Sequence, residues 1–135
     1  MRSLFAGLAL GLGLLALAAH AQAEVKGTFI GEGTYATAEG CNKLAAILAG
    51  GEKNVGTVPE TLDQDGFHGW EGDCTFHSFT EKSKGKVWTA NMKCFEGADE
   101  SQESDIFERL DDGRIQVTVM GKATVFQRCK NEGAK

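Results

Sequence analysis

The most reactive side chains of this 135-residue chain are those of four cysteines, Cys41, Cys74, Cys94 and Cys129. A free thiolate can act as a nucleophile or bind a metal, whereas two thiols can join as a disulfide. None of the four lies within a few residues of another, so the close cysteine pairs of structural zinc sites are missing from the sequence. Four cysteines in a short exported chain indicate two disulfides instead, and three pairings are possible.

The stretch from Phe67 to Gly97 favours one of these pairings, because two β-favouring arms flank a lysine-rich turn at 82–86. With the turn centred on Lys84, Cys74 and Cys94 face each other across an antiparallel pair, where Cα atoms come within disulfide range. The same register sets Phe76 opposite Met92, Ser78 opposite Ala90, and Thr80 opposite Trp88. We therefore predict the disulfides Cys74–Cys94 and Cys41–Cys129.

Side chains alternate along a strand, so the even positions of both arms share one face, which is apolar and carries both sulfurs. Around the mouth of a barrel, the large residues of this face and one tyrosine could line a pocket for a small ligand. The candidate ligand-binding residues are Trp70, Trp88, Phe76, Met92 and Tyr35. The other interpretation is plain core packing, which is the commoner role of such residues in a small β domain.

Residues for catalysis are scarce. His68 and His77 fall on opposite faces of the predicted hairpin, and the sequence holds no G-x-S-x-G stretch and no glycine-rich phosphate loop. Glu71, Asp73 and His77 share a face and could hold a divalent cation, but a solvated strand face is the better explanation for them. We expect no enzymatic activity, no metal and no cofactor.

The N-terminus has the form of a secretory signal peptide, with Arg2, an apolar run from Leu4 to Ala19, and the small-residue end Ala21-Gln22-Ala23. We predict cleavage after residue 23, so that residues 1–23 are removed. The alternative is a membrane anchor, but the run is too short to span a bilayer comfortably, and we expect no membrane span. The expected location is the periplasm or the medium.

Residues 24–135 suit one domain with one modest core. The chain carries 19 acidic and 14 basic residues, a formal net charge of −5. An acidic domain repels phosphate backbones, so we expect no nucleic-acid partner. We expect a monomer.

Hydrophobic alternation and turn signals predict the remaining elements. We expect a first strand over 25–37, a short amphipathic helix over 39–49, and an edge or irregular strand over 54–62 that contains Pro59. After the 67–97 hairpin, a polar loop is expected up to Glu103, then a second hairpin around Asp111-Asp112-Gly113, and a last strand over 123–129.

Consecutive antiparallel hairpins make a meander, which at this size closes into a barrel or stacks into a sandwich. We favour the barrel because the predicted Cys41–Cys129 bridge brings the start and the end of the chain together. The predicted fold is mostly β: a small antiparallel meander closing into a lipocalin- or avidin-like barrel of about seven to eight strands, with one helix and two disulfides.

These features favour a binding module without catalytic activity, which takes a small apolar ligand or a protein partner of the cell envelope. An inhibitor of an envelope hydrolase is one alternative, and a structural or accessory envelope protein is another.

Overall fold

The computed structural model describes residues 25–50 and 58–130. The predicted signal peptide, residues 1–23, lies outside the described residues. None of the helical structure within the described ranges has the length and apolar character that a membrane-spanning helix needs.

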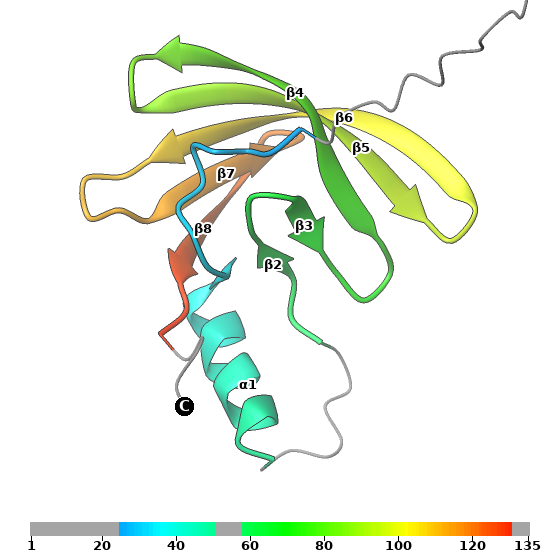
Figure 1. Cartoon of the computed structure of the whole chain (residues 1–135), viewed down its shortest axis with the longest axis vertical. Helices are drawn as coiled ribbons and strands as arrows, with labels where there is room; N and C mark the ends of the chain where they lie inside the picture. The colour runs from blue at the N-terminus through cyan, green and yellow to red at the C-terminus, as the bar shows by residue number, and fades with distance from the viewer. Residues whose placement is uncertain (1–24, 51–57, 131–135) are drawn as a thin grey trace, which may run out of the picture.

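Eight antiparallel strands form a closed barrel in which each strand pairs with its neighbours in chain order and β1 closes onto β8 (Figure 1). The strands are β1 (Tyr35–Ala36), β2 (Thr61–Leu62), β3 (Gly66–His68), β4 (Asp73–Ser83), β5 (Val87–Glu96), β6 (Asp99–Arg109), β7 (Ile115–Val119) and β8 (Lys122–Arg128). This confirms the predicted fold class. Closure satisfies the backbone groups that the edge strands of an open sheet would leave unpaired.

The helix α1 (Ala38–Leu48) follows β1 directly and lies outside the barrel (Figure 1). Thr37 caps it, because its Oγ1 accepts a hydrogen bond from the Gly40 amide at 3.0 Å. Gly50, at φ +72°, follows its C-terminus. The helix buries Cys41, which forms a disulfide with Cys129 just after β8.

Both predicted disulfides are present: Cys41–Cys129, with 5.2 Å between Cα atoms, and Cys74–Cys94, with 4.0 Å. Cys74 faces Cys94 across the β4–β5 ladder, and Phe76 faces Met92, as predicted.

The predicted register is wrong beyond Phe76. A bulge there leaves His77 out of the ladder, so Ser78 pairs with Asn91 and Phe79 pairs with Ala90. An extra residue in one strand exchanges the faces of everything that follows. As a result Phe79 packs against the core, and Trp88 pairs with Glu81 in place of Thr80.

Two further expectations about elements are wrong. The first strand is limited to Tyr35–Ala36, because residues 28–33 form turns and bends, and Gly33 takes a φ of +99°. The polar stretch up to Glu103 is no loop: it forms the first half of β6, which pairs with β5 from Asp99 to Glu108. Backbone pairing along an ordered neighbour needs no apolar side chain, and this half of β6 is mostly exposed.

The edge strand expected over 54–62 is reduced to β2, and the part of that range before Val58 lies outside the described residues.

The core consists of the inward-facing side chains of the strands and of two residues from the segment before β1, Phe29 and Ile30. In Figure 1 this segment, drawn in blue, runs across the barrel before it turns into α1. The segment therefore contributes side chains to the core as the eight strands do, although it forms no strand itself.

Candidate functional site

The segment around Phe29 fills one end of the barrel. The Phe29 ring stacks on Trp88 with 4.9 Å between centroids and makes edge contacts with Phe76, Phe79 and Phe107 at 5.0–5.5 Å. The Arg109 guanidinium lies 5.6 Å from the Trp88 ring and donates a hydrogen bond to the Phe29 carbonyl. This end of the interior is closed by packed aromatic rings.

Gln64 fixes the same segment from the β2–β3 turn. Its Nε2 donates to the Ile30 carbonyl at 2.9 Å, and its own backbone carbonyl accepts from the Gly27 amide at 2.7 Å. Gly27 is needed for this approach, because a Cβ there would lie 2.5 Å from the Phe76 ring. The closure is thus held by hydrogen bonds as well as by packing.

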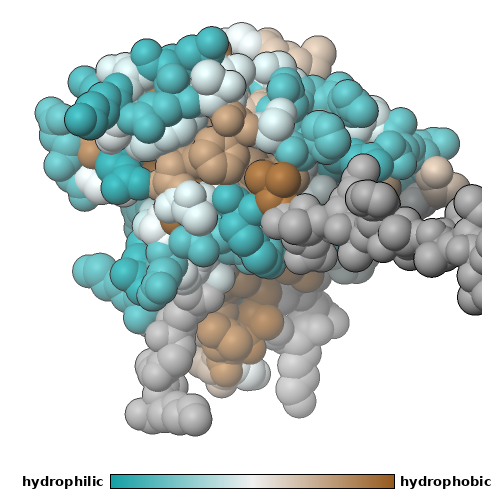
Figure 2. Space-filling model, turned by 45° about the horizontal axis from the view of Figure 1, so that its top comes forward, coloured by the Kyte–Doolittle hydropathy of each residue, from teal (hydrophilic) through white to brown (hydrophobic). Residues whose placement is uncertain are grey.

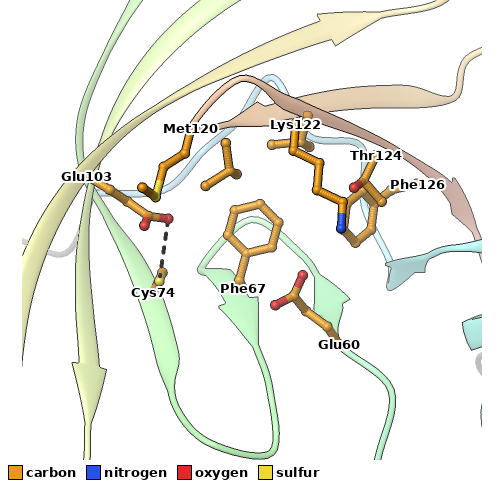
Figure 3. Close-up of a pocket in the computed structure, with 10 residues that line it drawn as sticks. Glu60, Phe67, Cys74, Glu103, Met120, Lys122, Thr124 and Phe126 are labelled. Atoms are coloured by element: carbon orange, nitrogen blue, oxygen red, sulfur yellow. Dashed lines mark hydrogen bonds between the residues drawn. The ribbon is translucent and has the colours of Figure 1, made fainter.

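The other part of the interior holds a cavity of about 490 Å³ (Figure 3). Its walls come from β3, β4, β6, β7 and β8, from the β7–β8 turn, and from the residue just before β2. The lining side chains are Glu60, Phe67, Cys74, Glu103, Val117, Val119, Met120, Lys122, Thr124 and Phe126. This volume is within the range of small-molecule sites in proteins.

The cavity has two kinds of wall. Phe67, Phe126 and the two valines of β7 form an apolar surface, and Met120, 94% exposed on the β7–β8 turn, lies at its margin. Glu60 and Glu103 add carboxylates, and Lys122 adds an ammonium group (Figure 3). A largely apolar concavity with a few polar groups is the usual form of a small-ligand site.

Glu103 reaches the disulfide. Its Oε1 lies 3.9 Å from the Cys74 sulfur, the contact drawn as a dashed line in Figure 3. Because a disulfide sulfur carries no hydrogen, this contact provides no donor to the carboxylate. Among the described residues, no ion pair joins Glu60, Glu103 or Lys122 to a partner.

Asp105 lies two residues beyond Glu103 on the inward face of β6 and is completely buried. Neither of its carboxylate oxygens has a hydrogen-bond partner within residues 25–50 and 58–130. The neighbouring Glu103 carboxylate is itself an acceptor, so the two can share a hydrogen bond only after one of them takes up a proton.

Burial raises the pKa of Asp105 to about 7, and the negative charges of Glu103 and Glu60 add to the effect. Burial also raises the pKa of Glu60, with a further contribution from Glu103. The three carboxyls therefore form one electrostatically linked group at the inner side of the cavity.

A metal centre is poorly supported by the arrangement. Within the described part of the chain, the one cluster of metal-ligand types consists of Cys74, Cys94 and Glu103. Two of these are joined in a disulfide and lack the thiolate that binds zinc. His68 is engaged by acidic neighbours, with Nε2 3.0 Å from Asp63 and Nδ1 3.8 Å from Asp73.

The structure separates the predicted ligand-binding residues from this cavity. Trp88, Phe76, Met92 and Tyr35 are buried in the core, and none of them lines the cavity. Trp70 does not face inward as predicted: it lies in the bend between β3 and β4 and is 68% exposed. β3 ends at His68 and β4 begins only at Asp73. Trp70 is therefore not part of the alternating strand on which that prediction depended.

Sequence reasoning missed Glu60, Glu103 and Asp105. A signal for two of them was present, because Glu103, Asp105 and Phe107 alternate into an apolar strand. The polar residues 96–103 predicted a loop instead, which ends at Glu103 and so divides this alternating stretch. No signal in the sequence indicated Glu60, since its place in the same cavity as Glu103 depends on closure of the barrel.

No protein-family model, curated protein or solved structure that was compared with this chain matches it.

Proposed function

We propose that this protein is a binding module without catalytic activity that holds a small, largely apolar ligand in the open part of its barrel. The observation that carries the proposal is the 490 Å³ cavity with phenylalanine and valine walls, in a barrel whose other end is filled by Phe29. A core built only for stability would be expected to leave no void of this size.

The proposed location is an oxidising compartment outside the cytoplasm, the periplasm or the medium. Two disulfides support this, because they persist in such compartments and are rare in the cytosol. A ligand carried there would be taken from the surrounding fluid through the cavity mouth.

The test is binding of N-phenyl-1-naphthylamine, an uncharged apolar dye that becomes fluorescent in a dry environment. Tryptophan quenching is a weaker readout, since Trp88 does not line the cavity and Trp70 is exposed. We expect saturable binding by the wild-type protein and its loss in Val119→Trp, which fills the cavity from β7.

The matched control is Thr118→Trp, which adds the same side chain one position earlier, to a residue outside the cavity lining. Thr118→Trp should bind the dye as the wild type does. Absence of dye binding by the wild type, or equal binding by folded Val119→Trp, would contradict the proposal.

A protein partner of the envelope, including a hydrolase that the protein would inhibit, is the second candidate. The exposure of Trp70 favours it, because exposed tryptophans are enriched at binding hot spots. Such a partner would bind Val119→Trp as tightly as the wild type, which distinguishes it from a ligand in the cavity.

A further inference from the structure

The buried carboxyl of Asp105 is the feature of the interior that packing does not explain. Its side chain is inaccessible to water, and both oxygens lack a hydrogen-bond donor among the described residues. Buried polar groups in proteins are nearly always hydrogen-bonded, so an unpaired one calls for a reason. An aliphatic residue at this position would avoid the problem.

The position of Asp105 connects it to the cavity. It lies on the inward face of β6 between Glu103, which lines the cavity, and Phe107, which lies in the core. Its carboxyl interacts electrostatically with both Glu103 and Glu60. A positive charge in the cavity, on the side of Glu103, would therefore stabilise the ionised carboxyl of Asp105.

Charge selects the kind of donor. Three carboxyls, Glu60, Glu103 and Asp105, are at or behind the cavity wall, against one ammonium group in the lining, Lys122. Lys122 forms no ion pair with any of them in the described part of the chain. The excess charge around the cavity is negative, and it disfavours an anionic ligand such as a fatty acid.

We infer that the cavity recognises an amphipathic amine, whose ammonium group donates to Glu103 at the wall and is attracted by the charge of Asp105 behind it, while the apolar walls contact its hydrocarbon body. This deepens the proposed function and depends on it. An ammonium group supplies a positive charge and up to three donors, and its hydrogen bonds to carboxylates are stronger than neutral ones.

A metal ion is a poorer occupant. Apart from the group that contains the disulfide sulfurs, the described carboxylates do not converge on a common point within metal-binding distance. An amine accommodates carboxylates that lie apart, because its N–H groups point in different directions.

The ionisation of Asp105 gives the proposal a pH signature. The groups that raise its pKa are Glu103 on its own strand and Glu60 before β2. Lys122 on β8 is the basic group of the cavity lining, and Ala90 and Met92, which face this part of β6 from β5, do not titrate. Above neutral pH Asp105 is ionised and attracts the ammonium more strongly. Amine affinity should rise from pH 5.5 to pH 8.5, while the affinity for a neutral ligand should stay constant.

The experiment is calorimetric titration of the protein, purified after expression of the full chain, with octylamine, 1-octanol and octanoate. These probes share one apolar body and differ in charge. We expect octylamine to bind about tenfold or more tighter than 1-octanol, the factor typical of a charge-assisted hydrogen bond, and octanoate to bind most weakly. Asp105→Asn should remove most of the amine preference and leave 1-octanol binding unchanged.

Asp99→Asn, an exposed change of the same kind on the same strand, is the control and should keep the preference. Glu103→Gln is a second variant that should lower the amine preference even if Asp105→Asn does not fold. Equal affinities for octylamine and 1-octanol, or a preference for octanoate, would overturn this inference and leave the proposed function standing. Failure of all three probes and of the apolar dye would overturn both.

Discussion

At the scale of single residues, Asp105 affects both the stability of the fold and the proposed recognition of an amine. It is the one polar residue that is fully buried in the described part of the barrel, and its carboxyl has no donor. A group of this kind costs folding free energy whenever it is ionised. Keeping it is reasonable only if something other than stability requires it, and the amine site proposed above would do so.

Asp105 should make the stability of the free protein depend on pH. Its pKa is about 7 in the folded state against an ordinary value of 3.8, so between these values the folded state holds a proton that the unfolded state releases. The contribution is therefore fully present below pH 3.8 and is lost as the pH rises through about 7. Thermal unfolding without ligand should show a decline in stability across this window.

Replacing the carboxyl removes this dependence. We expect Asp105→Asn to be more stable than the wild type at pH 8 by about 1–3 kcal/mol, a range that allows for water screening near Glu103 and for the unpaired amide. At pH 4 the difference should shrink or change sign. The exposed control Asp99→Asn should follow the wild type, and a pH-independent difference for Asp105→Asn would refute the assignment.

At the scale of elements, the segment before β1 supplies buried side chains to the core as a strand would, although it is not a strand. Figure 2 shows apolar side chains gathered at the centre of a largely hydrophilic face, and others over α1, where Leu48 is 71% exposed. Phe29 itself is buried and touches four other rings, among them Trp88. Most of the stability of the closed end should come from these contacts.

Truncation of Phe29 tests this role. Phe29→Ala should lower the free energy of unfolding in urea by about 3–5 kcal/mol, the usual cost of removing a buried phenylalanine ring. Trp88 emission should shift to the red, because its stacking partner is lost and water gains access. Phe95→Ala is the matched control: Phe95 is 39% exposed, so the loss should be much smaller. A loss of stability for Phe29→Ala as small as that for Phe95→Ala would show that the segment adds little to the barrel.

At the scale of the whole molecule, the two disulfides close loops of very different length. Cys41 and Cys129 are 88 residues apart and tie α1 to the end of β8, whereas Cys74 and Cys94 are 20 residues apart within one hairpin. The short pairing of β1 with β8, which spans two residue pairs, completes the barrel beside the longer link.

The longer link should contribute more to stability. In the loop-entropy model, removing Cys41–Cys129 by paired changes to alanine costs about 1 kcal/mol more than removing Cys74–Cys94 in the same way. Urea denaturation of the two double variants at equal protein concentration measures the difference. The order would be reversed if local strain in the barrel seam outweighed loop closure.

Features that depend on short-range spacing could be predicted from the amino-acid sequence. Period-two alternation and the turn around Lys84 led to the β4–β5 hairpin and to the Cys74–Cys94 pair, and elimination then led to Cys41–Cys129. The helix, predicted over 39–49 and observed at Ala38–Leu48, and the closed barrel also followed from local signals and from the second disulfide. These features are local or are fixed by one covalent link, so that neighbouring residues carry enough information to specify them.

The division of the inward-facing residues into those that fill the barrel and those that surround a cavity could not be predicted from the sequence and became visible in the folded structure. The bulge after Phe76 moved Phe79 into the core, and Trp70 lies in the bend before β4 instead of in that strand. Glu60 came within electrostatic range of Glu103 and Asp105 through the folding of distant segments. The physical reason is that a cavity is the volume that packing leaves empty, and this volume depends on every element that surrounds it at once.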